Sequence, residues 1–120
     1  AAWENLLVVR TPDNLNRLLA DIQDIRDRLP TAAIKTPYDV VEALETRSLL
    51  TVGEMIANVA MMRTESRASH YREDYPQRND ENWLKVIKVR RVEDEMMLEP
   101  FALDPGWQSR PGDLGDQTWG

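Results

Sequence analysis

Residues 63–85 carry the groups in this chain whose types and spacing could do chemistry. The stretch reads RTESRASHYREDYPQRNDENWLK and holds arginines, carboxylates and the single histidine of the chain, His70. A histidine beside carboxylates can act as a general acid or bind a metal ion. The stretch has no second imidazole and no plausible nucleophile, so we interpret His70 as a structural hydrogen-bonding residue and predict no catalytic residue.

Two acidic pairs, Glu73 with Asp74 and Asp80 with Glu81, raise the question of a calcium site. Their spacing is not that of an EF-hand loop, which also needs a glycine at its turn. The chain contains no cysteine, which excludes thiolate metal sites and thiolate-bound iron–sulfur clusters in this chain. No Gly-rich phosphate cradle is present either. We therefore predict no metal site and no cofactor-binding residue.

The charged segment can pair internally or across an interface. Arg67 and Arg72 have planar guanidinium groups that suit bidentate pairing with carboxylates such as Glu65. Aromatic residues, Tyr75 and Trp83 among them, are interleaved with the charges. On composition alone, the simpler interpretation is a solvated charge run that ends a helix. The density of directional hydrogen-bonding groups is also typical of a surface covered by another domain.

The residues ahead of this segment predict helices. Residues 3–8 have the apolar pattern of the last turns of a helix. Thr11 and Pro12 signal the start of a second helix, whose apolar residues recur at spacings of three and four up to residue 30. Thr36 and Pro37 signal the start of the longest periodic segment. We predict a mainly α fold built on a three-helix antiparallel bundle, similar to a spectrin repeat.

Gly53 lies inside the third predicted helix. It is one of several small residues that would let a neighbouring helix approach closely, which are Ser48, Gly53, Ala57 and Ala60. A glycine costs about 1 kcal/mol relative to alanine in a helix interior. We therefore expect tight helix packing at Gly53.

The helical spacing of apolar residues does not continue into the second half of the chain. β-branched residues at 86–92, an acidic turn and the segment 96–101 predict a short β-hairpin or two extended arms. We divide the chain into a bundle that ends in the charged motif at 1–75, arms or a hairpin at 76–101, and an irregular tail at 102–120. The tail contains Trp107 and Trp119 with no apolar period.

Charge and hydropathy exclude two classes of partner. The net charge of −6 and a pI near 4.8 argue against nucleic acid, which needs a basic surface. No apolar run approaches the roughly 20 residues that span a bilayer, so we expect no direct membrane insertion. The chain lacks an initiator Met and its apolar pattern is already under way at Trp3, so we interpret it as a fragment.

The order of residues in 63–85 resembles a motif of flavoprotein subunits in the fumarate reductase and succinate dehydrogenase family. Near their C-terminus these subunits have a pattern close to R-x-E-S-R-G-x-H-x-R-x-D-Y/F-P, then D-D-E-N-W-L-K, after a long helix. The resemblance extends over roughly residues 3–100. Departures are Ala68, where the family usually has Gly, Asn79 for a usual Asp, and Val86 where many succinate dehydrogenases have His. L-aspartate oxidases and adenylylsulfate reductase α subunits are relatives of this family.

The resemblance implies a role inside a larger FAD-dependent oxidoreductase. In the family, FAD and the catalytic residues belong to a preceding Rossmann-like domain and a mobile capping domain, so this chain would bind no FAD and would be inactive alone. It would be a C-terminal domain that packs on the FAD domain. The residues predicted to form the polar docking surface are Arg63, Glu65, Arg67, His70, Arg72, Asp74 and Trp83.

The resemblance also implies the partners and location of the parent protein. The expected partners are the FAD and capping domains of the parent chain, with an iron–sulfur subunit as a further candidate. The expected location is cytoplasmic, peripheral at the inner membrane through partner subunits. The alternative from the residues themselves is an autonomous helical module that binds a protein partner through its charged segment and tail.

Overall fold

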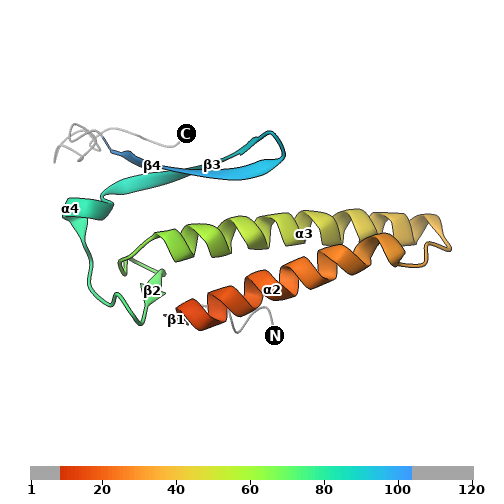
Figure 1. Ribbon diagram of the computed structural model, residues 1–120, viewed down its shortest axis with the longest axis horizontal. Coiled ribbons are helices and arrows are strands. Elements are labelled where there is room, and N and C mark those ends of the chain that lie inside the picture. The colour runs from red at the N-terminus through yellow and green to blue at the C-terminus, as the bar shows by residue number, and fades with distance from the viewer. Residues whose placement is uncertain (1–8, 104–120) are drawn as a thin grey trace, which may run out of the picture.

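The computed structural model describes residues 9–103 of the 120. Two long helices lie side by side, and a β-hairpin lies along the second of them (Figure 1). In chain order the elements are β1 (Val9–Arg10), α2 (Pro12–Arg28), η1 (Leu29–Thr31), α3 (Pro37–Met62), β2 (Tyr71–Arg72), α4 (Asp80–Trp83), β3 (Lys85–Val92) and β4 (Glu95–Ala102). The described part is therefore mainly helical with one small antiparallel hairpin, in agreement with the predicted fold class at that level.

Both long helices begin at the residues that the sequence indicates. The backbone N–H of Asn14 donates to Thr11 Oγ1 at 3.2 Å, and Pro12 occupies the first helical position. At α3 the cap is reciprocal, because Asp39 N donates to Thr36 Oγ1 at 3.3 Å while Thr36 N donates to Asp39 Oδ2 at 2.7 Å. These bonds satisfy N–H groups that a helix start otherwise leaves unpaired. The two predicted helix starts are confirmed.

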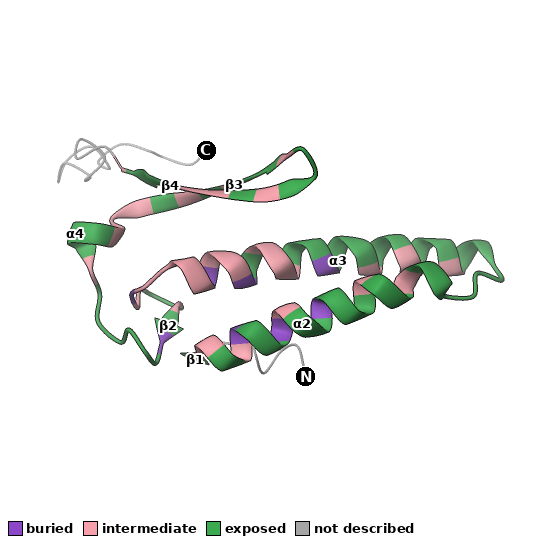
Figure 2. Cartoon of the chain, in the orientation of Figure 1, coloured by how far each residue is buried: buried purple, intermediate pink, exposed green. Residues whose placement is uncertain are grey.

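The core lies in the seam between α2 and α3, where Figure 2 shows the buried residues. Its members are Leu15, Leu18 and Ile22 of α2 with Leu50, Ala57 and Ala60 of α3. Gly53 lies in the same seam, since a Cβ on this residue would be 3.3 Å from Ile22 Cδ1. That distance is shorter than ordinary van der Waals contact, so the expectation of tight packing at Gly53 is confirmed.

The three-helix detail of the prediction is not confirmed. The described residues contain two long helices, and the segment 3–8 expected to end a first helix lies outside them. The first described residues form β1, which pairs in parallel with β2 so that Val9 lies opposite Tyr71 and Arg10 opposite Arg72. A two-residue strand has too few side chains to show a period, which is why the sequence did not indicate this pairing.

The second half contains the predicted hairpin. β3 and β4 pair antiparallel from Lys85 opposite Ala102 to Val92 opposite Glu95. The two turn residues, Glu93 and Asp94, have φ values of 49° and 68°. Positive φ at both central residues is the geometry of a type I′ turn, whose twist matches that of a hairpin. The hairpin is confirmed, and the predicted tail with Trp107 and Trp119 lies outside the described residues.

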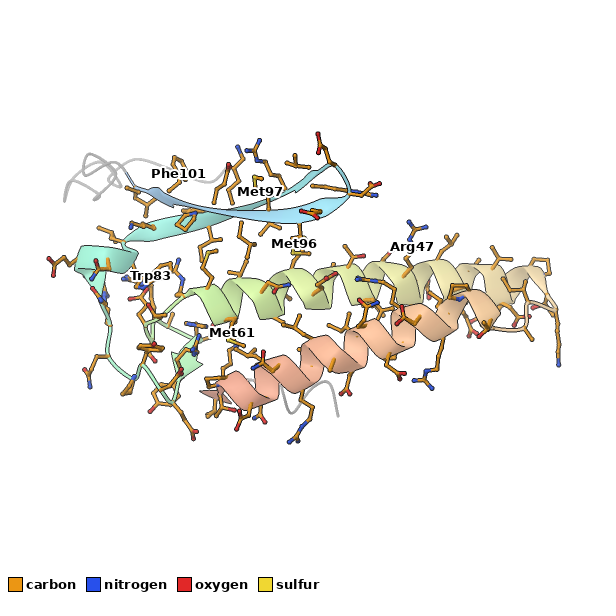
Figure 3. The ribbon with its side chains drawn as sticks, in the orientation of Figure 1. Arg47, Met61, Trp83, Met96, Met97 and Phe101 are labelled. Carbon is orange, nitrogen blue, oxygen red and sulfur yellow. The ribbon has the colours of Figure 1, made fainter. Side chains whose placement is uncertain are left out.

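One face of the hairpin is directed at α3. Val89 and Met96 line a hollow together with α3 residues, and Met96 Sδ lies 3.9 Å from Asn58 Nδ2. Figure 3 shows Met96 between the hairpin and α3, with Phe101 on the outer side. The hairpin therefore covers a second face of α3, next to the face that contacts α2.

We expect Gly53→Leu to separate α2 from α3, because the added side chain would occupy space held by Ile22. Overpacking of this kind costs about 1–3 kcal/mol, more than the helix propensity gained by removing a glycine. Urea denaturation of the chain measures the change. Thr51→Leu is the control, because Thr51 is an exposed α3 residue that faces the hollow under the hairpin and not α2, and it should not lower the midpoint. Equal stability of the two variants would contradict the close contact.

Candidate functional site

Glu65 is the centre of the charged segment and is fully buried, with 0% of its surface exposed. Its Oε1 accepts from Arg63 Nη1 at 2.6 Å and from Arg67 Nε at 2.8 Å. Its Oε2 accepts from Arg67 Nη2 at 3.1 Å and from the backbone N–H of Asn79 at 2.8 Å. One carboxylate thus joins the end of α3, the turn after it and the start of α4.

Burial and hydrogen bonding act on the pKa of Glu65 in opposite directions. Burial raises it, while the hydrogen bonds from Arg67, the Asn79 backbone and Arg63 lower it, and together they leave the pKa below its usual value. The carboxylate is therefore charged at neutral pH. A lowered pKa in the folded state means that the group stabilises the fold above its unfolded pKa, and that this contribution is lost as the pH falls through the folded value.

Arg63 connects the end of α3 to the hairpin. Its Nη1 donates to the carbonyl oxygen of Trp83 at 3.0 Å, and its Nη2 donates to that of Lys85 at 2.7 Å. The guanidinium carbon also lies 5.1 Å from the centroid of the Trp83 ring, within cation–π range. Trp83 Nε1 donates to Thr64 Oγ1 at 2.8 Å. These contacts hold α4 and the first residue of β3 against the helix end (Figure 3).

Arg72 caps the C-terminus of α3 from the side. Its side chain is 3% exposed, and Nη1 donates to the carbonyl oxygens of Ala60 at 2.8 Å and Met61 at 2.9 Å. The last carbonyls of a helix have no partner within the helix and carry partial negative charge, so a cation there is favourable. Asp74 receives two bonds from Arg72, at 2.7 and 2.6 Å. The side-chain hydrogen bonding from Arg72 lowers the pKa of Asp74 below its usual value.

A second carboxylate, Asp80, lies at the edge of this cluster. It accepts from Arg67 Nη2 at 2.5 Å and from Arg78 Nε at 2.7 Å. The hydrogen bond from Arg78, followed by that from Arg67, lowers the pKa of Asp80 to about 2. Asn79 caps α4 with its side-chain oxygen, which accepts from the Asn82 backbone at 3.0 Å. An uncharged cap suits this position, since the Asn79 backbone already contacts the Glu65 carboxylate.

His70 pairs with a residue sixty positions earlier. Its Nδ1 lies 2.5 Å from Arg10 Nη1. Arginine can only donate, so Nδ1 is the acceptor and the proton of the neutral ring is on Nε2. Burial, followed by the nearby charge of Arg10, lowers the pKa of His70. His70 and Arg10 also line a hollow of about 410 Å³ between α3 and Val89. A neutral, hydrogen-bonded imidazole agrees with the structural interpretation of His70.

The structure brings all the predicted docking residues into one region after α3. They are Arg63, Glu65, Arg67, His70, Arg72, Asp74 and Trp83. Their polar contacts within the described residues are to one another, to nearby backbone and to the side chains of Arg10, Thr64 and Asp80. Whether they also contact another domain stays a prediction. The sequence did not point to Arg10, which has no local signal, or to Asp80 as the second partner of Arg67. Residues 9–103 contain no group of three His, Asp or Glu side chains placed to hold a metal ion.

We expect Glu65→Gln to destabilise the chain by about 3–5 kcal/mol, because it removes the buried negative charge between Arg63 and Arg67. Urea denaturation at neutral pH measures the change. Glu99→Gln is the matched control: it removes the exposed ion pair with Arg90 and should alter stability by less than about 1 kcal/mol. Similar losses in the two variants would show that Glu65 does not organise the cluster.

We expect Ala68→Gly to stabilise the chain by about 0.5–1 kcal/mol. Ala68 has a φ of 50° in a tight turn closed by backbone hydrogen bonds between Arg67 and His70, at 2.8 and 2.9 Å. Glycine adopts this conformation without steric cost. Ala32→Gly is the control, because Ala32 has a φ of −63° and should lose stability. A lower unfolding midpoint for Ala68→Gly would contradict this account of the turn.

Comparisons with known proteins agree on one family. Residues 1–107 match the family described as fumarate reductase flavoprotein C-term. The succinate dehydrogenase flavoprotein subunit of Bacillus subtilis is 36% identical over 93 residues, which are 73% of this chain and 16% of that protein. An uncharacterised FAD-dependent oxidoreductase of Methanocaldococcus jannaschii is 28% identical over 88 residues, which are 73% of this chain and 16% of that protein.

Comparison with solved structures leads to the same family. A solved structure of E. coli quinol fumarate reductase superposes with a TM-score of 0.76 at 28% identity, covering 85% of this chain and 19% of that one. This chain thus spans less than a fifth of the length of these relatives. All three comparisons agree with the motif at 63–85, the helix pair and the hairpin. The chain belongs to the C-terminal domain family of the fumarate reductase and succinate dehydrogenase flavoproteins.

Proposed function

We propose that this chain is the structural C-terminal domain of a FAD-dependent oxidoreductase of the fumarate reductase or succinate dehydrogenase type. The observation that supports this best is the family match, which covers residues 1–107 and names the C-terminal part of the flavoprotein. The described residues form a helix pair and a hairpin fixed by a buried charge cluster, which suits a structural role. In this proposal the chemistry belongs to the rest of the parent subunit, and this chain alone is inactive.

FAD is the cofactor of the parent and is held outside this chain. One relative is named as FAD-dependent, and others are named as flavoprotein subunits. This chain offers no Gly-rich turn at which a helix start could bind the pyrophosphate of a dinucleotide. Its contribution is to hold the FAD-binding part of the parent in place.

The partly exposed members of the charge cluster are the polar part of this contact. The side chain of Arg67 is 25% exposed and that of Asp74 is 32% exposed, although each already has a charged partner. Groups fixed in this way can bind a neighbouring domain with little further loss of side-chain entropy. We place the FAD and capping domains of the parent against this surface.

An iron–sulfur subunit is a further proposed partner of the parent. Solved relatives include quinol fumarate reductase, a name that specifies quinol as a reactant of that enzyme.

Within the described residues no helix is long and apolar enough to cross a bilayer. We propose a cytoplasmic parent that lies at the inner membrane through partner subunits. The alternative, an autonomous helical binding module, is not favoured, because the family match covers the whole described region.

The test uses the full-length parent purified with its flavin. We expect it to oxidise succinate or reduce fumarate in a flavin-dependent way, while the 120-residue chain binds no FAD and shows no turnover. In the same parent, Arg67→Ala should lower the melting temperature and increase loss of FAD, because Arg67 joins Glu65 to Asp80 at the proposed contact.

Arg78→Ala is the matched control for this substitution. Arg78 also pairs with Asp80, but its side chain is 62% exposed and it does not reach Glu65. Equal FAD retention in the Arg67→Ala, Arg78→Ala and unmodified proteins would exclude the docking role. A parent without flavin-dependent turnover would exclude the proposed enzyme type.

A further inference from the structure

Arg10 and His70 line a hollow of about 410 Å³, which we call the Arg10 hollow. Arg10 belongs to β1 and His70 directly precedes β2, so the pairing of these two strands brings the two side chains together. The other residues that line the hollow are mostly apolar: Met55, Ile56, Val59, Ala60 and Arg63 from α3 and its end, and Val89 from β3. A guanidinium and an imidazole thus share a mainly apolar space.

Two donor atoms of the residues that line the Arg10 hollow are without a partner. Arg10 Nε and His70 Nε2 are both shielded from solvent, and neither makes a hydrogen bond within residues 9–103. Nδ1 of His70 accepts from Arg10 Nη1 at 2.5 Å, so Nε2 carries the ring proton and both atoms are donors. Buried donors are nearly always paired in folded proteins. These two N–H groups therefore require an acceptor from outside the described residues.

The charge of Arg10 is also uncompensated in the described part of the chain. Arg63, which lines the same hollow, pairs with Glu65 at 2.6 Å. The Arg10 side chain has a hydrogen bond to His70, whose ring is neutral. Burial lowers the pKa of Arg10, but a guanidinium stays protonated at neutral pH. A partly buried cation of this kind is stable when an anion lies beside it.

We propose that an Asp or Glu side chain of the parent subunit, from outside residues 9–103, enters the Arg10 hollow and pairs with Arg10. The pairing rests on the proposed function, since it is one of the contacts that hold this domain in the parent. The matched region makes up only 16–19% of the relatives that cover most of this chain. The remainder of such a polypeptide is the source of the carboxylate.

The chemistry of the Arg10 hollow favours a carboxylate side chain over water and over a small inorganic anion. Water can accept the two hydrogen bonds but leaves the charge of Arg10 unpaired. A carboxylate supplies a negative charge and lone pairs on two oxygens, which suits a guanidinium with a second N–H group nearby. The apolar side chains of Met55, Ile56 and Val59 suit the methylene groups of Asp or Glu, whereas a small anion would lose its hydration beside them.

His70 positions Arg10 for this contact. Its Nδ1 accepts from Arg10 Nη1 and so fixes one end of the guanidinium, which leaves Nε for the carboxylate. Arg10 is the last residue of β1, and Pro12 begins α2 two positions later. A carboxylate bound to Arg10 therefore connects the parent to the start of the first long helix.

Carbodiimide cross-linking of the flavin-loaded parent carrying Arg10→Lys tests the contact. The reagent activates a carboxyl group, which then forms an amide with an amine in direct contact. Mass spectrometry should show the introduced amine linked to an Asp or Glu outside residues 9–103. Arg26→Lys is the matched control, because Arg26 lies 2.6 Å from Glu54 and the variant should link to it. A link from position 10 only to carboxylates within residues 9–103 would overturn the proposal.

Native-state proteolysis of the parent decides the question where no link forms at position 10. If a carboxylate pairs with Arg10, Arg10→Lys keeps the opposite charge, whereas Arg10→Gln leaves the carboxylate buried without a partner. Cleavage in the C-terminal region should then be at least about tenfold faster in Arg10→Gln than in Arg10→Lys. Without such a carboxylate, Arg10→Lys buries an unpaired ammonium and is cleaved as fast or faster. That order would overturn the proposal.

Acetate serves as the probe for a free carboxylate in the Arg10 hollow. Added acetate should change the cleavage of the unmodified parent by less than about twofold, because a side chain of the parent already occupies the hollow. Acetate that slows cleavage of the unmodified parent but not of Arg10→Gln would overturn the proposal, since the ligand would then be a free ion.

The outcome is separable from that of the proposed function. Flavin-dependent turnover of the unmodified parent is measured on the same preparation. Turnover without the link and with the reversed order of cleavage would overturn only the pairing of Arg10. A link outside residues 9–103 in a parent without such turnover would support the pairing and overturn the enzyme assignment.

Discussion

The buried carboxylate of Glu65 is the interaction on which the second half of this domain depends. Removing a charge from water costs several kcal/mol, which only well-placed donors offset. Here Arg63, Arg67 and the Asn79 backbone supply them, and each belongs to a different part of the chain. Because all three must converge on the same two oxygens, the helix end, the following turn and the start of α4 can adopt essentially one relative arrangement.

Arg72 stabilises the end of α3 in a similar way, because it donates to carbonyl groups that would otherwise have no partner. A 26-residue helix ends with carbonyls that nothing within the helix can satisfy. Arg72 reaches those of Ala60 and Met61, and Asp74 neutralises its charge at close range. Arg72 is also a strand residue, and its strand pairs with β1 at the entrance to α2. The cap therefore ties the end of the second long helix to the beginning of the first.

The parts of this fold that follow from local signals could be predicted from the sequence, and the parts that depend on distant partners could not. Thr11 and Thr36 cap their helices through residues three positions away, and the hairpin joins two eight-residue strands that are neighbours in sequence through the acidic turn at Glu93 and Asp94. The motif order after Arg63 indicated where the polar cluster lies. In contrast, the bond between Arg10 and His70 joins residues sixty apart, and no spacing rule relates them.

Unpaired buried polar groups and exposed apolar surface differ in how much free energy they cost this domain. An unpaired buried polar group costs about 1–3 kcal/mol, and both oxygens of the buried Glu65 carboxylate accept hydrogen bonds within the described residues, whereas His70 Nε2 has no partner there. Exposed apolar surface costs less, about 25 cal/mol per Å², so an apolar side chain can stay exposed until a neighbouring element covers it. The cluster around Glu65 is accordingly complete, while Leu49 is 72% exposed. Polar groups therefore fix the internal geometry of this domain, whereas its exposed apolar side chains place no such demand on the fold.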